Sequence, residues 1–566
     1  MKARNVLLGR GETPGATRIT RRDFLKIGGT GLAGATLLGA AGCGVFQQGG
    51  GGQGGGDGGG SSAVAVNLGD TIRDLDSTTT TDSVSTDILL NVMSGLYRLD
   101  PNQEPVPDMA EGVEISDDKL TYTFTLRDGI QWSNGDPVTS QDFKYAWLRA
   151  LDPDTAGQYA YILTSFIEGA TEFNAGDGSA EDVAIETPDD KTLRVTLASP
   201  SPFWLGLTSF FTYLPQNQKF VEEQGDQYAQ NANALLYNGP YTLNQFNPTN
   251  GVTMVKRDDY WDADNVVIQR VEGKIVKELD TAVNLYESGE LDDVEIDGQY
   301  VQEYSDTPDF WSQTYFATFY MVPNQDKVPL FQNENVRKAI QMGFDRQALV
   351  DQILQNGSEA ASGFVPEGMA GPGDQTYREA LGPTMPEFDP QQARKLFQQG
   401  VEEVGENPPI ELLAYDDSTA RDIATFLQSQ LQDNLGAKVN VKVQPFDRKL
   451  ELESNGQFEL SWQGWIADYN DPINFLELFE SDNAFNTSGY SNKRYDQLIE
   501  GARKETDFAQ RMQMLLDAEK VLVTETAGTA PMYFEGEAHL IRPAIKNYVD
   551  HKYGAGIDVR WWKLES

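Results

Sequence analysis

The segment with the clearest capacity for chemistry runs from Trp462 to Pro472 and reads WQGWIADYNDP. It places one acid, Asp468, directly after the apolar run Trp465–Ala467. A strand that ends here would carry a carboxylate into a partly apolar site, where a cation that also donates hydrogen bonds, such as an ammonium, satisfies it best. The alternative is a core strand that ends in an ordinary turn.

The chain has few residues that could support metal binding or nucleophilic catalysis. The chain has one cysteine, Cys43, and two histidines, His539 and His551, which excludes a cysteine-rich zinc site, a Cys/His dyad and a disulfide framework. It has no phosphate-binding G-x-x-x-x-G-K-[ST] loop and no G-x-S-x-G nucleophile elbow. We therefore predict no catalytic residues, no metal site and no cofactor. Paired carboxylates for glycoside hydrolysis stay open, because the fold and not the sequence sets their separation.

The composition indicates a large, folded, acidic protein. Of the 566 residues, 39% are hydrophobic and 10% aromatic, which is enough for real cores, and at about 150 residues per domain the length allows three or four domains. The 86 acidic residues outnumber the 44 basic ones and give a net charge of −42. Such a surface repels phosphate backbones, so nucleic acid is excluded as a partner.

The first 42 residues have the pattern of an export signal. Basic residues precede an apolar, glycine-rich run at 27–42, which is short for a bilayer core that needs about 20 helical residues. Arg21 and Arg22, continued by Phe24–Lys26, resemble the twin-arginine export motif. We predict that residues 1–42 are a signal peptide and not a permanent anchor.

Cys43 is a candidate for lipid attachment. It ends the tetrapeptide AAGC, which resembles a lipoprotein cleavage box but has Ala40 where leucine is typical. Residues 43–62 are rich in glycine and form a flexible tether. We expect an exported protein that an N-terminal lipid holds on the cell membrane, facing the periplasm or the extracellular space. Ordinary cleavage nearby, with Cys43 unmodified, is the alternative.

The body of the chain reads as mixed α/β. Residues 120–127 alternate apolar and polar side chains, which predicts a half-buried strand, followed by a turn and a return strand at Ile130–Trp132. Thr139 and Asp142 form a capping-box pattern at the start of a helix.

Later segments add parallel strand pairing. A short apolar run at Ile410–Leu413, a helix over Ala420–Leu435 and an alternating run at Val439–Val443 predict a βαβ unit. One further helical stretch is predicted from Tyr495 to Leu522.

Five segments resemble the signature of the oligopeptide- and dipeptide-binding family of solute-binding proteins that serve ABC importers (bacterial solute-binding protein family 5). In chain order they are LRDGIQWSNGDPVT at 126–139, NGPYTL at 238–243, DYWD at 259–262, SGELD at 288–292 and VRKAI at 336–340. The matches are collinear from about residue 64 to 534. Together with the lipoprotein-type leader, they identify the chain as a member of that family.

The resemblance implies a two-lobed α/β fold of the periplasmic-binding-protein type II class, with three domains and a hinged ligand cleft. Ligand contacts to both lobes would shift the population toward the closed form. The implied division is 63–94, 218–318 and 534–566 for domain I, 95–217 for domain II, and 319–533 for domain III.

The resemblance also implies ligand-binding residues. Asp468 would bind the α-ammonium of a peptide, and Gly464, Trp465 and Ile466 would offer backbone groups to an extended chain, as in strand addition. The other implied residues are Phe446 as an aromatic wall and, from the facing lobe, Thr81, Asp82, Ser83 and Tyr159.

The chain departs from the family where a peptide carboxylate would be neutralised. Positions that correspond to basic residues in other members read Trp462, Glu453 and Ala420. Arg421 and Arg448 are the nearest substitutes in sequence.

The implied function is capture of short peptides by a monomer and their delivery to a membrane permease with its ATPases. Three alternatives stay open: the same fold with another solute, such as an oligosaccharide or a metal chelate; an exported hydrolase; and a sensory receptor for peptide signals.

Overall fold

A long ladder of strands organises the part of the chain that the structure describes. The computed structural model describes residues 62–416, 418–483, 485–554 and 556–565. The predicted signal peptide and nearly all of the tether, with Arg21, Arg22 and Cys43, lie outside these residues. Among the described helices, none combines the length and the apolar character that crossing a membrane requires.

Within the described part of the chain, the largest sheet contains eleven strands. Their order is β15 (Val439–Gln444), β14 (Ile410–Tyr415), β16 (Leu460–Ile466), β12 (Phe310–Pro323), β17 (Ala530–Ile541), β11 (Asp293–Ile296), β1 (Ala63–Asn67), β10 (Arg270–Lys274), β9 (Gly251–Lys256) and β8 (Tyr241–Asn247), with β13 (Glu359–Ala360) beside β17.

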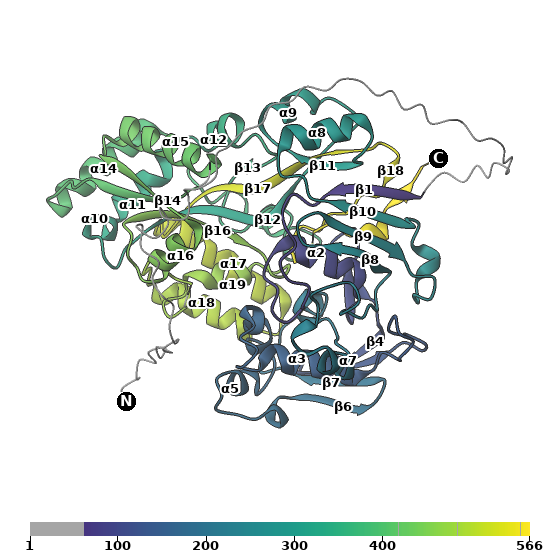
Figure 1. The fold of residues 1–566 in the computed structure, drawn as a ribbon. Helices are drawn as coiled ribbons and strands as arrows, with labels where there is room; N and C mark the ends of the chain where they lie inside the picture. Colours follow the sequence, from purple (N-terminus) through teal and green to yellow (C-terminus); the bar gives the residue numbers. More distant parts are fainter. Residues whose placement is uncertain (1–61, 417, 484, 555, 566) are drawn as a thin grey trace, which may run out of the picture. The chain divides into compact units, whose positions relative to one another are not determined.

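Two long antiparallel strands, β12 and β17, hold the two halves of this sheet together (Figure 1). The C-terminal end of β17 pairs with β11, and the C-terminal half of β12 pairs with β16. The β12–β17 pairing is interrupted between Thr314 and Thr318, so residues 315–317 leave the ladder. Such an irregularity bends a strand and re-aims its side chains.

A separate four-stranded sheet has the order β4 (Ala110–Ile115), β5 (Thr121–Leu126), β7 (Thr192–Thr196) and β6 (Ile185–Asp189), with α3 (Ser140–Leu151) close to it (Figure 1). The predicted strand is confirmed as β5, and the Thr139–Asp142 capping box is confirmed at the start of α3. The predicted return strand is wrong. Gln131 makes only a single bridge, to Pro137, because the chain turns back within a few residues.

The predicted βαβ unit is confirmed, since β14 and β15 pair in parallel across α15 (Ser418–Leu435). The single helix predicted from Tyr495 to Leu522 is wrong. It is two helices, α18 (Lys493–Lys504) and α19 (Phe508–Glu519), because Asp507 starts a new helix by accepting a hydrogen bond from the Gln510 amide at 2.9 Å.

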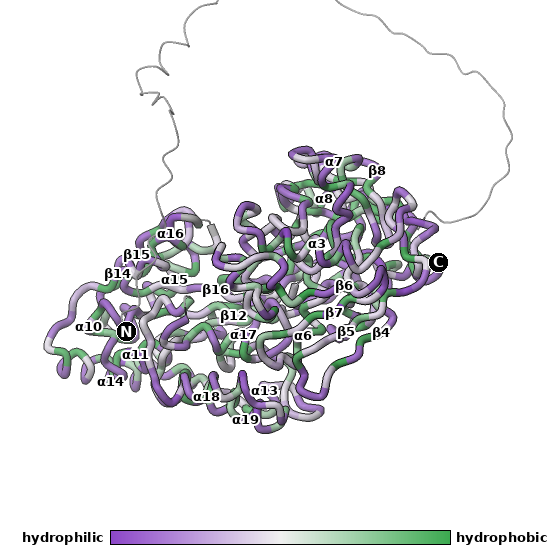
Figure 2. Tube along the Cα trace, turned by 90° about the horizontal axis from the view of Figure 1, so that it is seen from below, coloured by the Kyte–Doolittle hydropathy of each residue, from purple (hydrophilic) through white to green (hydrophobic). Residues whose placement is uncertain are grey.

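Hydropathy follows this arrangement. Figure 2 shows mixed, mostly pale colours along β12 and β16, whereas α14 (Pro390–Val404) and α18 alternate between purple and green. Near the four-stranded sheet, Trp147, Trp204 and Tyr213 are fully buried and meet edge to face. Such aromatic pairs add about 0.5–1.5 kcal/mol beyond the area that they bury.

The domain boundaries predicted at 318/319 and 533/534 fall inside β12 and β17. The three-domain division itself stays a prediction.

A buried ion pair anchors the loop that follows β16. Asp471 accepts two hydrogen bonds from Arg511 of α19, at 2.7 and 2.8 Å, and both side chains are almost fully buried, with 4% and 3% of their surface exposed. Asp471 also accepts the Ile473 amide at 3.0 Å at the start of α17 (Ile473–Leu476). The pair therefore ties this loop to a distant helix.

We expect Arg511→Met to lower the free energy of unfolding by about 3–5 kcal/mol, because it leaves the Asp471 carboxylate buried without its cation. Urea unfolding followed by tryptophan fluorescence measures this loss. The double variant Asp471→Asn/Arg511→Met should lose less than the single one. As a control, Lys504→Met removes an exposed pair with Glu500 and should leave the midpoint unchanged. Equal midpoints for Arg511→Met and the wild type would contradict the anchoring role.

Candidate functional site

Asp468 lies two residues beyond the end of β16 and is held by backbone contacts on both sides. The Ala467 amide donates to the carbonyl of Phe316, at 2.7 Å, where β12 has left its ladder with β17. The Asp468 amide donates to the Asn474 side-chain oxygen at 3.0 Å. The interruption of β12 thus provides the acceptor that positions the acid.

Among the described residues, the carboxylate of Asp468 has only neutral donors. Tyr161 of α4 (Tyr161–Thr164) donates its hydroxyl to Oδ1 at 3.0 Å, and Asn474 donates its amide to Oδ2 at 3.2 Å. Burial, aided by the nearby Glu477 charge, raises the pKa of Asp468 to about 6 despite these two hydrogen bonds. In the described residues no ion pair reaches it. A cation beside this carboxylate would stabilise its ionised form, which burial disfavours.

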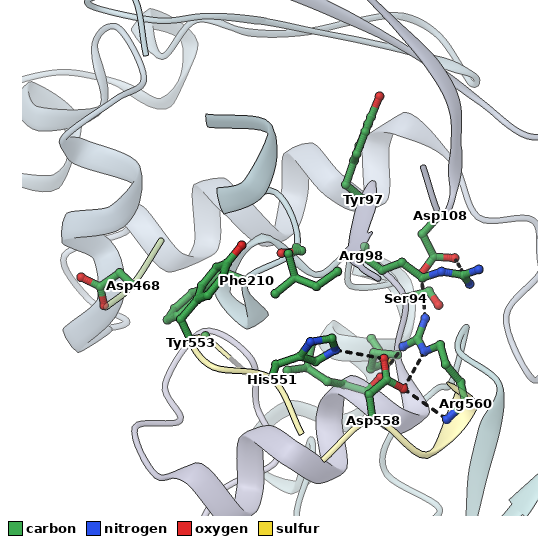
Figure 3. Close-up of a pocket in the computed structure, with 16 residues that line it drawn as sticks. Ser94, Tyr97, Arg98, Asp108, Phe210, Asp468, His551, Tyr553, Asp558 and Arg560 are labelled. Carbon is green, nitrogen blue, oxygen red and sulfur yellow. Dashed lines mark hydrogen bonds and ion pairs between the residues drawn. The ribbon is translucent and has the colours of Figure 1, made fainter. Parts of the chain in front are cut away.

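Nearby basic side chains are engaged elsewhere. Figure 3 shows Asp468 at one side of a small cavity, with Phe210 and Tyr553 between it and an ion-pair network in that view. In that network Arg560 donates to Asp558 at 2.9 Å and lies 3.1 Å from Asp108. The cations closest to this cavity are thus already neutralised.

A cavity of about 700 Å³ brings most of the predicted ligand-binding residues together. Its lining contains Thr81, Asp82, Ser83, Tyr159, Ile466 and Asp468. Asp82 begins α2 (Ser83–Val92) by accepting the Ser85 amide at 2.9 Å. Residues from positions 81–83 and 466–468, far apart in sequence, therefore share one cavity.

A second cavity of about 440 Å³ also has Asp468 in its lining. Trp465 lines it and meets Phe485 edge to face with ring centres 5.0 Å apart. Phe203 and Tyr469 also line it, stacked 4.2 Å apart. Asp468 lines both cavities, so a ligand in either one can reach its carboxylate.

The end of β16 also has a free edge. Gly464, Trp465 and Ile466 pair with β12 on one side, but in the described residues β14 pairs with β16 only near Leu460 and Ser461. Backbone groups on the other side of residues 464–466 are available to an extended chain. A Cβ atom at Gly464 would come within 2.5 Å of the Phe319 ring, so close packing requires glycine there.

Two predicted residues lie apart from these cavities. Phe446 is 61% exposed, stacks on Tyr415 and lines neither cavity. Gly464 also lines neither, and its side of the strand faces Phe319. The substitutes considered for carboxylate binding, Arg421 and Arg448, pair with exposed acids on their own segments.

Sequence reasoning missed Tyr161 and Asn474, the two donors to Asp468, as well as Phe210 of the cavity wall. Tyr161 is two residues from the predicted Tyr159, but it lies 307 positions from Asp468. No spacing rule links residues so far apart, so only the folded chain reveals the contact.

One group could hold a metal ion among the described residues. Glu537, His539 and Asp550 have ligand atoms within 4.8 Å of one another. His539, however, places Nδ1 2.8 Å from Asp293 and Nε2 3.5 Å from Glu537. These acids raise its pKa well above the usual value, despite the opposing effect of burial. A protonated imidazole has no lone pair for a metal, so the group fits a metal poorly.

Comparison with known proteins agrees with this geometry. Residues 104–487 match the family model described as bacterial extracellular solute-binding proteins, family 5 Middle. The dipeptide-binding protein DppE of Bacillus subtilis (strain 168) is 34% identical over 540 residues, which cover 95% of this chain and 98% of that protein. The oligopeptide-binding protein OppA of the same strain is 34% identical over 464 residues, with 80% of this chain and 84% of that protein covered.

Solved structures share the fold. The substrate-binding domain of an oligopeptide ABC transporter from Bacillus anthracis str. Ames superposes with a TM-score of 0.76 at 34% identity, covering 89% of this chain and 99% of the other. Listeria monocytogenes OppA bound to peptide gives a TM-score of 0.75 at 35% identity, covering 90% and 100%. The chain therefore belongs to the family 5 solute-binding proteins of ABC importers, which are binding proteins and not enzymes, and it has their α/β type II periplasmic-binding fold.

Proposed function

We propose that this protein captures short peptides in the cavities around Asp468 and delivers them to a membrane permease with its ATPases. The observation that carries the proposal is a carboxylate without a cation, placed between two cavities and beside a free strand edge. The names of the relatives, a dipeptide-binding protein and an OppA bound to peptide, support the same ligand class.

Asp468 is the proposed partner of the peptide α-ammonium. The carboxylate already accepts from Tyr161 and Asn474, and its remaining lone pairs can accept from an ammonium. A charge-assisted hydrogen bond stabilises the ionised acid in a place where burial opposes ionisation. The ammonium therefore supplies what the protein itself does not.

The free edge of β16 is the proposed site for the peptide backbone. Hydrogen bonds from residues 464–466 to an extended peptide do not depend on its side chains, so they give affinity without strong sequence preference. The two aromatic-walled cavities, of about 440 and 700 Å³, leave room for varied side chains.

Closure of two lobes is the proposed means of capture. Tyr161 belongs to the predicted domain II and Asp468 to domain III, and their hydrogen bond of 3.0 Å joins the two segments. A ligand that contacts both segments favours the closed arrangement by its difference in affinity for the two states.

The alternative solutes fit Asp468 less well. An oligosaccharide would use aromatic walls such as Trp465 and Phe203, but it would bring no cation to the carboxylate. A peptide-sensing role uses the same pocket and differs in the partner protein. A solved relative described as the pheromone receptor PrgZ, with a TM-score of 0.75 at 35% identity and covering 89% of this chain and all of that one, makes this a second candidate.

Attachment to the membrane through Cys43 is part of the proposal, with export directed by Arg21 and Arg22. The glycine-rich residues 43–62 would let a monomeric binding body reach its permease from the membrane surface.

The Asp468→Asn variant should lose about 2–5 kcal/mol of affinity for a tripeptide with a free amino terminus, because the ammonium loses its charged partner. Calorimetry with the peptide and its N-acetylated form measures the effect, and the acetylated form should bind the wild type as weakly as the free peptide binds the variant. Asp326→Asn, at an exposed acid beside Lys327, is the matched control. Equal affinity of the wild type for both peptides would rule out the ammonium anchor.

Peptide affinity should fall in acid, because a proton competes with the ammonium for Asp468. The pKa of about 6 in the free protein predicts a loss approaching tenfold per pH unit below pH 6. Above about pH 8 the peptide amine itself loses its proton and affinity falls again. Titrations between pH 5 and 9 with a peptide of uncharged side chains test this. An acid limb of the same size in Asp468→Asn would assign it to another group.

Cys43→Ala should move the protein from the detergent phase to the aqueous phase in a detergent phase-partition experiment on producing cells, since the lipid attachment point is gone. Peptide affinity should stay unchanged, because Cys43 precedes the binding body. A variant that still partitions into detergent would show that another element anchors the protein.

A further inference from the structure

A group of acidic residues on β17 and the segments next to it lines the cavity of about 700 Å³ that contains Asp468. The strand alternates Glu535, Glu537 and His539 with small or apolar residues. Successive side chains of a strand point to opposite faces, and Phe534, Ala538 and Leu540 are buried in the core. The three polar side chains therefore share the other face, and all three line the cavity that also contains Asp468.

Neighbouring strands add further acids to this face. Tyr315, in the interrupted part of β12, has its hydroxyl within hydrogen-bond distance of both Glu537, at 2.9 Å, and Asp550. Glu295 of β11 lines the same cavity. We call Glu295, Glu535, Glu537 and Asp550 the acidic wall.

Few basic side chains of the protein balance the carboxylates of the acidic wall. The lining of the cavity contains eight carboxylates but only one lysine, Lys552, and no arginine. Of its two histidines, His551 lies 3.5 Å from Asp558, and His539 lies 2.8 Å from Asp293. Burial raises the pKa of Glu295, Glu535 and Asp550 to about 7. These three acids are therefore only partly ionised at neutral pH, and an entering cation would favour their ionised forms.

Two members of the wall, Glu295 and Glu535, line the cavity without a side-chain hydrogen bond to the described residues. Glu295 is exposed, whereas Glu535 is half-buried. Burial, together with the charges of Glu537 and Glu295, raises the pKa of Glu535 to about 7. A cationic donor would relieve both the missing hydrogen bond and the repulsion.

We propose that the acidic wall binds the basic side chain of a peptide, an ammonium or a guanidinium, and so makes this protein selective for peptides that contain lysine or arginine. The inference rests on the proposed function, since it assigns a side-chain subsite in the cavity where Asp468 would hold the α-ammonium. A cavity of about 700 Å³ contains both groups. A metal ion is a poorer occupant, because His539 faces a carboxylate with each ring nitrogen.

The test uses the full-length protein and pentapeptides in which one lysine moves through an alanine background. Each is compared by calorimetry with a peptide that has norleucine, which keeps the carbon chain but lacks the ammonium. In at least one position lysine should bind about tenfold tighter or better, as expected for a charged hydrogen bond. Glu535→Gln, and the double variant Glu535→Gln/Glu537→Gln, should reduce this ratio to about twofold or less while the norleucine peptide keeps its affinity.

The control is Asp70→Asn, which removes a carboxylate from the same cavity lining, but one that already pairs with Lys277. It should leave the lysine preference intact. If it reduced the preference as much as Glu535→Gln, overall charge and not a subsite would be responsible, and the proposal would be overturned.

The remaining outcomes separate this inference from the proposed function. Binding that depends on Asp468 but shows no preference for lysine at any position overturns the acidic-wall subsite alone. Failure of every peptide to bind overturns both. Titration with zinc chloride alone, in the wild type and in Glu535→Gln, should show no stoichiometric binding. Zinc binding that requires the wall would replace the subsite by a metal site.

Discussion

The antiparallel pairing of β12 with β17 joins the two sides of the large sheet and positions the candidate site. These two strands connect the β8–β11 side of the large sheet with the β14–β16 side. Their pairing has a register shift between Phe319 and Tyr320 and a longer interruption between Thr314 and Thr318. At this interruption the Phe316 carbonyl accepts the Ala467 amide, and Tyr315 reaches Glu537 and Asp550. One local irregularity therefore positions both Asp468 and part of the acidic wall.

The buried carboxylates fall into two classes, those paired with an arginine and those without a basic partner among the described residues. Asp471, Asp558 and Glu519 are paired with arginines at about 3 Å or less, and these pairs hold loops and helices in place. Asp468 and Glu535 line the cavities without a basic partner, and burial raises the pKa of each. A paired acid contributes to the fold, whereas an unpaired acid opposes folding and gains its stabilisation only when a cation arrives. The difference in pairing separates structural acids from binding acids within one very acidic chain.

Much of the fold could be predicted from the sequence, because its signals are local. Alternation over residues 120–127, the Thr139–Asp142 capping box and the βαβ pattern at 410–443 depend on neighbours within a few turns or one strand. The errors also came from local signals. The helical pattern from Tyr495 to Leu522 continues across the break where Asp507 starts a second helix, and the residues around Gln131 turn back before they can form a strand.

The binding site combines local and long-range signals. Motifs of consecutive residues are enough to predict the family of solute-binding proteins and to select Asp468, the acid after an apolar strand. The groups that surround this acid come together only in the folded chain. Tyr161 lies 307 residues away in sequence, and the acidic wall combines β11, β17 and the segment around Asp550. The physical reason is that affinity for a cation depends on burial and on missing partners, and both are properties of the folded neighbourhood, whereas strands, caps and family motifs are written in consecutive residues.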